Sequence, residues 1–187
     1  MLILASASPR RLELLARIGI VPDKIIPADI DESVRKNELP RQYALRVALE
    51  KALAISEQFP NDYILSADTV VSIGRRILPK AEDEKTAREC LELMSGRNHD
   101  VTTAIVLIKN GKIAKRAVQT KIKFKLLTTN ETENYIASNE WHGKAGSYGI
   151  QGLAGAFIMH LNGSWEGVMG LPLYETKCLL DGMGYGR

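Results

Sequence analysis

The chain has 187 residues, the length of about one domain, and its 45% hydrophobic and 25% charged residues are typical of a soluble globular protein. No apolar run is long enough to cross a membrane, the N-terminus becomes charged too early for a signal peptide, and two cysteines are too few for a disulfide framework. A net charge of +3 suits an anionic ligand but does not by itself indicate nucleic-acid binding. We therefore expect one cytoplasmic domain, residues 1–187, without membrane or nucleic-acid partners.

The first predicted elements are a strand and a helix. Residues 2–5 form a short apolar run that predicts a buried strand. Ser8 is a favoured helix N-cap and Pro9 fits the first helical position, so a helix should begin here and end before Gly19. The residues expected on its apolar side are Leu12, Leu15 and Ala16.

The next segments alternate strands and helices. Residues 24–27 predict a second strand and residues 29–32 an acidic loop, and helical spacing predicts a long helix over 40–58. The apolar run 63–72 is typical of a central strand buried on both faces, and a helix is predicted over 83–95. The expected apolar face of the long helix comprises Ala44, Val47, Ala48, Ala52 and Ile55.

The C-terminal half predicts more strands. Residues 99–108 and 118–126 should pair through a hairpin at Asn110-Gly111, and a second hairpin is expected around Asn162-Gly163. The alternation of lysine and apolar residues over 121–125 favours an edge strand. Further helices are expected near residues 128–130 and after Pro172. Interleaved strands and helices predict the α/β class, with a mixed twisted sheet and flanking helices.

Two arginines lie where a helix dipole disfavours them. Arg10 and Arg11 occupy the first turn of the predicted helix, at its positive end. They are either solvated surface residues or part of an anion site, because helix N-termini bind phosphate and arginine adds paired donors.

Two further charges interrupt apolar patterns. Lys51 lies within the apolar stripe of its helix, so it either extends its ammonium to solvent or directs it into a pocket. Asp68 interrupts the buried strand, where a carboxylate must be paired, bound to a metal or protonated. It either fixes a neighbouring loop or serves as a metal ligand or general base.

A glycine-rich stretch covers residues 143–155, with glycine at every third position. It is either a structural loop with positive φ angles or a backbone that approaches a ligand closely, with Gln151 offering a donor and an acceptor. Neither of the common nucleotide-binding glycine motifs is present, and the three histidines form no zinc motif.

Eight motifs occur in order along the chain: ASASPRR, IDE, EKA, ADTVV, LPKAED, LMSGRNHDVTTA, KAGSYGIQG and VMGLPL. Together they resemble the Maf family, nucleoside triphosphate pyrophosphatases also described as septum formation inhibitors. The resemblance covers nearly the whole chain. ADTVV and KAGSYGIQG look like the branch that hydrolyses dTTP and UTP rather than the branch that acts on 7-methyl-GTP.

The resemblance implies a fold similar to that of inosine triphosphate pyrophosphatases, with two lobes around a cleft and often a homodimer. It also implies cleavage between the α and β phosphates of a nucleoside triphosphate, with Mg²⁺ or Mn²⁺ as cofactor. By motif, Asp68 is the proton acceptor and, with Glu32, a metal ligand. The implied substrate-binding residues are Ser6, Arg10, Arg11, Lys51, Thr69, Lys80 and Gln151, of which Arg10, Thr69 and Gln151 hold the specificity positions.

The chain departs from the family pattern in three places. It has SADT where the family often has GADT, Ala81 where a proline often follows the lysine, and Gly143 where an aspartate often precedes Lys144. The missing proline predicts a looser loop around Lys80. Three other functions remain open: a 7-methyl-GTP pyrophosphatase, a nucleotide-binding regulator of septum formation without essential catalysis, and a nucleic-acid binder.

Overall fold

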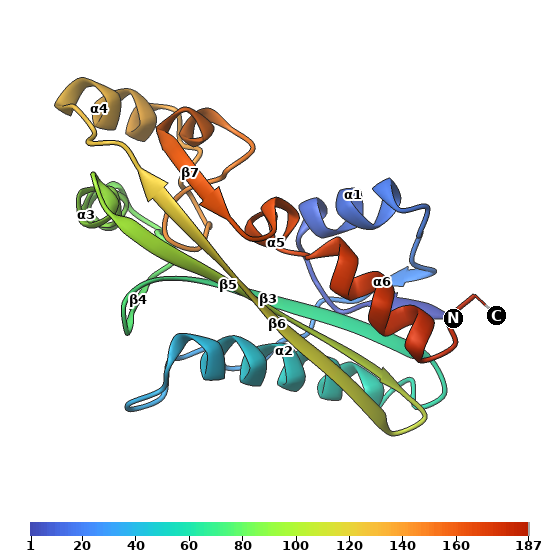
Figure 1. Ribbon diagram of the computed structural model, residues 1–187. Coiled ribbons are helices and arrows are strands. Elements are labelled where there is room, and N and C mark those ends of the chain that lie inside the picture. The colour runs from blue at the N-terminus through green and yellow to red at the C-terminus, as the bar shows by residue number, and fades with distance from the viewer. Residues whose placement is uncertain (187) are drawn as a thin grey trace.

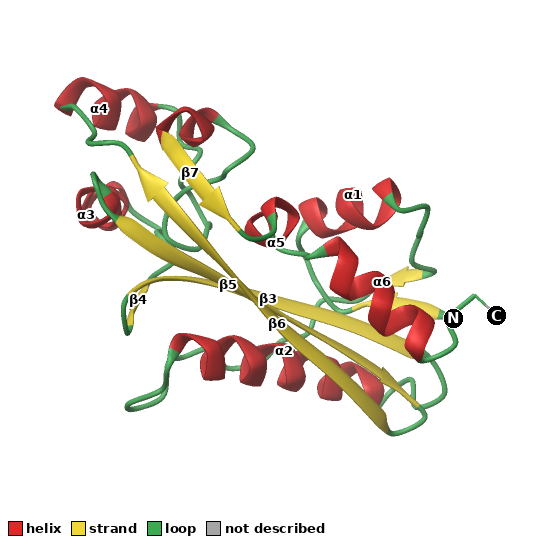
Figure 2. Cartoon of the chain, viewed as in Figure 1, coloured by secondary structure: helices red, strands yellow, loops and turns green. Residues whose placement is uncertain are grey.

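A seven-stranded mixed sheet forms the centre of the molecule in this computed structural model, which describes residues 1–186 (Figure 1; Figure 2). The strands are β1 (Leu2–Leu4), β2 (Lys24–Ile25), β3 (Tyr63–Ile73), β4 (Arg76–Leu78), β5 (Asn98–Lys109), β6 (Lys112–Phe124) and β7 (Ile158–Asn162). Their order is β2-β1-β3-β5-β6-β7, with β4 paired to β3. β1 runs parallel to β2 and β3, whereas the other pairs are antiparallel. The predicted mixed α/β architecture is therefore confirmed.

Helices cover both faces of this sheet. They are α1 (Pro9–Arg17), α2 (Pro40–Ser56), α3 (Glu84–Met94), α4 (Thr129–Ala137), α5 (Trp165–Met169) and α6 (Leu173–Gly182), with a 3-10 helix η1 at Leu153–Phe157. Figure 1 shows α2 alone on one face, α1, α5 and α6 on the other, and α3 and α4 at the far end of the sheet. Among the described residues, no helix has the length and hydrophobicity needed to cross a membrane.

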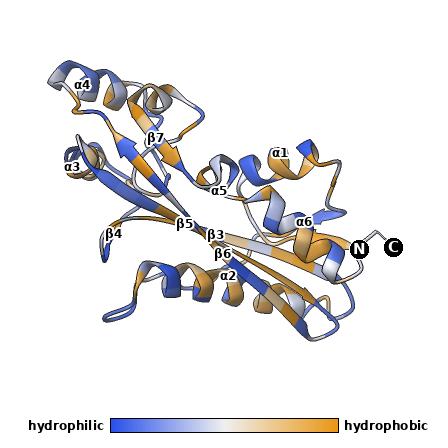
Figure 3. Cartoon of the chain, in the orientation of Figure 1, coloured by the Kyte–Doolittle hydropathy of each residue, from blue (hydrophilic) through white to orange (hydrophobic). Residues whose placement is uncertain are grey.

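The sheet separates two hydrophobic cores. One packs α2 on its face of β3 and β5, and all five residues predicted for the apolar side of α2 are buried in it. The other packs α1, α3, α5 and α6 on the opposite face and is the larger of the two. Figure 3 shows orange hydrophobic residues alternating with blue ones on the helices, as this packing requires. β3 is therefore buried on both faces, as its apolar sequence predicted.

A gap in the pairing of β3 determines where a site can form. Along one edge, β1 pairs with β3 only as far as Leu65, and β4 pairs with it only from Val71 onward. The segment 66–70 between them keeps its other edge paired to β5. Because successive side chains of a strand point to opposite faces, neighbouring side chains from both faces of β3 can line a site at this gap. The loops that leave β1 and β4 border it.

Two predicted features of the C-terminal half are wrong. Asn162-Gly163 does not turn into another strand, because Ser164 caps the N-terminus of α5 by accepting a hydrogen bond from the amide of Gly167. β7 instead pairs back to β6, next to Thr120, and the Cβ of any other residue at 163 would lie 2.6 Å from Thr120 Oγ1.

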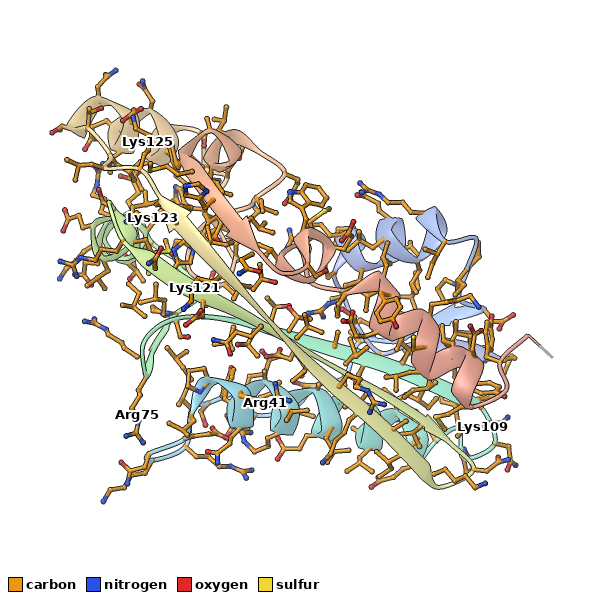
Figure 4. The ribbon with its side chains drawn as sticks, in the orientation of Figure 1. Arg41, Arg75, Lys109, Lys121, Lys123 and Lys125 are labelled. Carbon is orange, nitrogen blue, oxygen red and sulfur yellow. The ribbon has the colours of Figure 1, made fainter. Side chains whose placement is uncertain are left out.

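The lysine-rich segment 121–125 is consequently not an edge strand, because β7 covers residues 121–124. Figure 4 labels Lys121, Lys123 and Lys125 where β6 runs beside β7. The sequence signal was local, whereas the partner strand begins more than thirty residues later. The Asn110-Gly111 hairpin is confirmed, with φ angles of 48° and 73° at its two residues.

The first helix also differs in detail from its prediction. α1 begins at Pro9 as expected, but the side chain of Ser8 makes no capping hydrogen bond. Leu14 and Leu15 are its buried residues, whereas Ala16 is exposed. The buried side of the helix is therefore rotated toward Leu14 relative to the prediction. The prediction missed this because the packing partners of the helix, such as α5, cannot be seen in the local sequence pattern.

Candidate active site

A cavity of about 400 Å³ lies at the gap beside β3. It is bordered by the loop after β1, the first turn of α1, the loop after β4 and the glycine-rich stretch. The structure brings to this cavity all nine residues singled out from the sequence: Ser6, Arg10, Arg11, Glu32, Lys51, Asp68, Thr69, Lys80 and Gln151. These residues come from six separate segments, so only the tertiary fold assembles them.

An ionic network occupies one end of the cavity. Lys51 Nζ lies 2.7 Å from Glu32 Oε1 and 3.0 Å from Asp68 Oδ1, and Lys80 Nζ lies 2.8 Å from Glu32 Oε2. Asp68 is only 3% exposed and Lys51 8% exposed, so their charges compensate each other in a largely dry environment. Lys51 therefore directs its ammonium into the pocket, which settles the alternative left open by the sequence.

The loop that carries Glu32 has no regular structure but is well anchored. The Tyr43 hydroxyl donates to the Glu32 carbonyl oxygen at 2.9 Å. One turn further along α2, Arg46 donates to the Ser33 carbonyl oxygen and forms a 2.6 Å ion pair with Glu38. The long helix thus fixes the loop whose carboxylate enters the cavity.

Burial and neighbouring charges move the pKa values of the two carboxyl groups in opposite directions. Burial raises the pKa of Asp68 above its ordinary value, against the opposing attraction of Lys51 and Arg11. Burial would also raise the pKa of Glu32, but hydrogen bonds from Lys51 and Lys80 outweigh it and lower the pKa to about 2. Asp68 is therefore the more basic of the pair, as a proton acceptor should be.

Arg11 is a built part of the cavity wall rather than a solvated surface residue. Its Nη1 donates to Ser6 Oγ at 2.8 Å and its Nε donates to the Gly170 carbonyl oxygen at 2.9 Å. The arginine thereby connects the loop after β1 to the turn after α5. Arg10 lines the same cavity from the next position, so the open N-terminus of α1 and two guanidinium groups present positive charge together.

The other end of the cavity is formed by the glycine-rich loop, which is tied to the loop carrying Lys80. The amide of Gly143 donates to the Ala81 carbonyl oxygen at 3.0 Å and that of Gly146 to the Pro79 carbonyl oxygen at 3.2 Å. Between them, Lys80 and Ala145 form an isolated antiparallel bridge. These contacts hold the Lys80 loop in place even though the family's proline is missing at Ala81.

Thr69 and Gln151 line the cavity from two different segments, β3 and the glycine-rich loop. Thr69 points to the face of β3 opposite Asp68, and its hydroxyl lies 2.8 Å from the Thr103 hydroxyl, which donates to the Gly167 carbonyl oxygen. Gln151 lies in the glycine-rich loop and is exposed. The side-chain amide of Gln151 thus remains available to a ligand.

The sequence did not single out two further residues of the wall, Lys144 and Tyr148. Tyr148 is buried, and its hydroxyl lies 2.8 Å from Nε2 of the buried His99. Burial lowers the pKa of His99 to about 4, which keeps the ring neutral near pH 7. Their positions inside the KAGSYGIQG motif were the only available signal, because neither residue breaks an apolar pattern.

Glu32 and Asp68 supply carboxylate oxygens of the kind that a hard divalent cation binds, and both now contact the Lys51 ammonium. Within residues 1–186, no group of three or more His, Cys, Asp or Glu side chains could hold a metal ion. A cation would therefore have only Glu32 and Asp68 as charged protein ligands. Such a small carboxylate set matches Mg²⁺, which commonly keeps several waters and binds substrate phosphates as well.

Comparison with known proteins identifies the class. The Maf-like protein family matches residues 1–183, and the chain therefore belongs to the Maf family. The dTTP/UTP pyrophosphatase of Caulobacter vibrioides is 57% identical, covering 98% of this chain and 96% of that protein. Proteins of the same name from Hyphomonas neptunium and Rhodospirillum rubrum are 56% and 55% identical, covering 100% and 98% of this chain and 97% and 88% of theirs.

One solved structure is similar at a much greater distance. The Staphylococcus aureus Ham1 protein superposes with a TM-score of 0.48 at 12% identity, over 66% of this chain and 71% of that chain. This similarity is too distant to bear on function.

Proposed function

We propose that this protein is a nucleoside triphosphate pyrophosphatase that hydrolyses dTTP and UTP to the nucleoside monophosphate and pyrophosphate. The observation that carries the proposal is the charge arrangement of one cavity. Its two carboxylates are already paired by Lys51 and Lys80, which leaves an excess of positive charge. Arg10 and Arg11 at the N-terminus of α1 contribute to this excess. A triphosphate would complement that excess.

The names of the relatives support the proposal that dTTP and UTP are the substrates. Proteins that share more than half of their residues with this chain, over nearly its whole length, are named dTTP/UTP pyrophosphatase. The motifs ADTVV and KAGSYGIQG, which separate that branch from the 7-methyl-GTP branch, carry Thr69 and Gln151 on the cavity wall.

The chain's own groups suggest how the reaction would proceed. Asp68 accepts a proton from the attacking water, a role that its raised pKa favours. Arg11 holds phosphate oxygens through its planar guanidinium, which the Ser6 and Gly170 contacts keep in place. A divalent cation bound by Glu32 and Asp68 would neutralise charge on the phosphates. Catalysis then depends mainly on position and electrostatics, as is usual for phosphoryl chemistry.

The test is a product analysis. The purified protein is incubated with dTTP, UTP and 7-methyl-GTP in the presence of Mg²⁺ or Mn²⁺, and monophosphate, pyrophosphate and orthophosphate are quantified. Pyrophosphate from dTTP and UTP is the expected product. Orthophosphate as the primary product would contradict cleavage between the α and β phosphates, and preferred turnover of 7-methyl-GTP would contradict the branch assignment.

We also propose a cytoplasmic role in nucleotide metabolism and a homodimeric state. Both follow from the family rather than from the geometry of the cavity. A regulator of septum formation without essential catalysis would bind nucleotides but release no pyrophosphate, so the same product analysis separates it from an enzyme.

A further inference from the structure

Two polar side chains of the glycine-rich loop share one wall of the cavity. A Cβ built on Gly149 would lie 3.1 Å from Lys144 Cε and 3.3 Å from Gln151 Nε2. Lys144 and Gln151 therefore both lie against Gly149, and both line the cavity. A side chain at 149 would crowd the lysine and the amide, so glycine at this position allows them to lie together.

The ammonium of Lys144 has unused hydrogen-bonding capacity. It donates to the Glu140 carbonyl oxygen, which uses one of its three N–H groups. Within residues 1–186, no carboxylate forms an ion pair with it, and Arg10 is a cationic neighbour. Burial and the charge of Arg10 lower the pKa of Lys144. An electron-rich ligand oxygen would therefore be a favourable partner.

Gln151 alone cannot distinguish uracil from cytosine. A side-chain amide presents one donor face and one acceptor face, and its rotation exchanges them. One orientation matches the N3–H and O4 of uracil or thymine, and the other matches the N3 and amino group of cytosine. Discrimination between these bases needs a second group that cannot change its role.

We propose that Lys144 is that group: its ammonium donates a hydrogen bond to O4 of uracil or thymine and so excludes cytosine. An ammonium is a donor only, and the C4 amino group of cytosine would face it as another donor. The proposal rests on the proposed function, because it concerns the base of the same nucleotide. It assigns Lys144 to specificity rather than to the phosphates.

The loop geometry fixes the backbone around Lys144, and the Glu140 carbonyl oxygen contacts its ammonium. Lys144 lies between Gly143 and Gly146, whose amides donate to the loop that carries Lys80. The residue next to it, Ala145, forms the bridge with Lys80. The base-reading lysine and the phosphate-side lysine thus belong to one bonded pair of loops.

The experiment compares UTP and CTP as substrates. kcat/KM is measured for both nucleotides with the wild type, Lys144→Met and Lys144→Arg, and melting temperatures confirm folding. Methionine places its sulfur and methyl group where Cδ and Cε of Lys144 lie near Gly149, but it has no ammonium. The ratio of kcat/KM for UTP to that for CTP should fall about 10- to 100-fold in Lys144→Met, mainly through KM for UTP, and less in Lys144→Arg.

Other outcomes overturn the inference. Equal losses for UTP and CTP would place Lys144 at the phosphates or at O2, which both bases share, and no loss for either nucleotide would remove it from recognition. If the wild type releases no pyrophosphate from UTP, the proposed function fails separately. Calorimetric binding of UMP and CMP to the wild type and Lys144→Met then tests the inference itself, with loss of preference for UMP expected.

Discussion

The two ends of the cavity hold their polar groups by different means. At the ionic end, formed by Glu32, Lys51, Asp68 and Lys80, side chains hold one another through charge, and Lys51 and Asp68 emerge from a long helix and a central strand. At the loop end, formed by Lys144, Gly149 and Gln151, backbone contacts between two loops place the side chains. We propose that the ionic end contains the groups for the chemical step and that the loop end contains those that select the base.

This contrast between the two ends predicts which property a substitution at each end should change. Charged groups on rigid elements are suited to a reaction that tolerates little displacement. A loop whose backbone is fixed by hydrogen bonds can carry different side chains without a change in its backbone conformation. Changes at the ionic end should therefore lower kcat, whereas changes at the loop end should alter KM or stability.

The largest effect is expected at Asp68. Asp68→Asn keeps the shape of the side chain but removes the proton acceptor, so kcat for UTP should fall by at least about 100-fold while nucleotide binding is retained. Steady-state kinetics and calorimetric binding of UTP measure the two quantities. An unchanged kcat would remove Asp68 from the role of base.

Arg11 should be nearly as sensitive, even to a substitution that keeps its charge. Arg11→Lys loses the planar group that grips two phosphate oxygens and the donor pair to Ser6 and Gly170. The expected cost is roughly 1.5–3 kcal/mol, or about 10- to 100-fold in kcat/KM. Arg10→Lys is the comparison, since within residues 1–186 no side-chain hydrogen bond or ion pair of Arg10 would be lost with it. Full activity of Arg11→Lys would contradict the anion site.

At the loop end, Gly146 tests the path of the backbone. Gly143 and Gly146 have nearly equal φ angles of 62° and 63°, but only at Gly146 would a Cβ meet another side chain, 2.6 Å from Val71 Cβ. Gly146→Ala should therefore lower the free energy of unfolding by about 1–3 kcal/mol more than Gly143→Ala. Denaturant unfolding of both variants measures the difference, and equal losses would show that the loop can move away from β3.

A smaller effect is expected at Gln151. Gln151→Ala removes hydrogen bonds to the base, which contribute roughly 0.5–1.5 kcal/mol, so KM for UTP should rise by up to about tenfold with little change in kcat. Kinetics with UTP and dTTP test it. A fall in kcat without a rise in KM would contradict the division between the two ends.

The two ends should also respond to acid at different pH. The pKa of Glu32 is lowered from 4.5 to about 2, so its stabilising contribution is present above about pH 4.5 and lost as pH falls toward 2. The pKa of His99, beneath Tyr148, is lowered from 6.5 to about 4, so its contribution is lost as pH falls from 6.5 toward 4. Thermal unfolding is measured from pH 7 to pH 2. The loss of stability between pH 4.5 and 2 should be smaller in Glu32→Gln, and the loss between pH 6.5 and 4 should be smaller in His99→Gln. Curves identical to the wild type would contradict these assignments.

Much of the ionic end could be predicted from sequence because charge interrupts regular patterns there. Lys51 breaks the apolar stripe of α2, and Asp68 breaks the apolar run of β3. Both elements are long, so their periodicity is clear, and the structure places them as predicted. The interruption of a strong pattern was itself the signal.

The loop end and the sheet edges could not be predicted in the same way. The bridge between Lys80 and Ala145 joins residues far apart in sequence and obeys no local pattern. The pairing of β7 with β6 was missed for the same reason, since Asn162-Gly163 signals a turn but does not specify whether a strand or a helix comes after it. Lys144 breaks no periodicity, so its place in the KAGSYGIQG motif was the only sequence signal for its position in the cavity.

The bond between Arg11 and the Gly170 carbonyl oxygen joins positions 159 residues apart. During synthesis on the ribosome, α1 and the first strands emerge long before the segment that completes this contact. In a growing chain that has not yet reached Gly170, Arg11 thus has only its Ser6 contact, and the cavity lacks one wall. The complete site therefore requires the segment around Gly170, and chains truncated before Gly170 cannot have it.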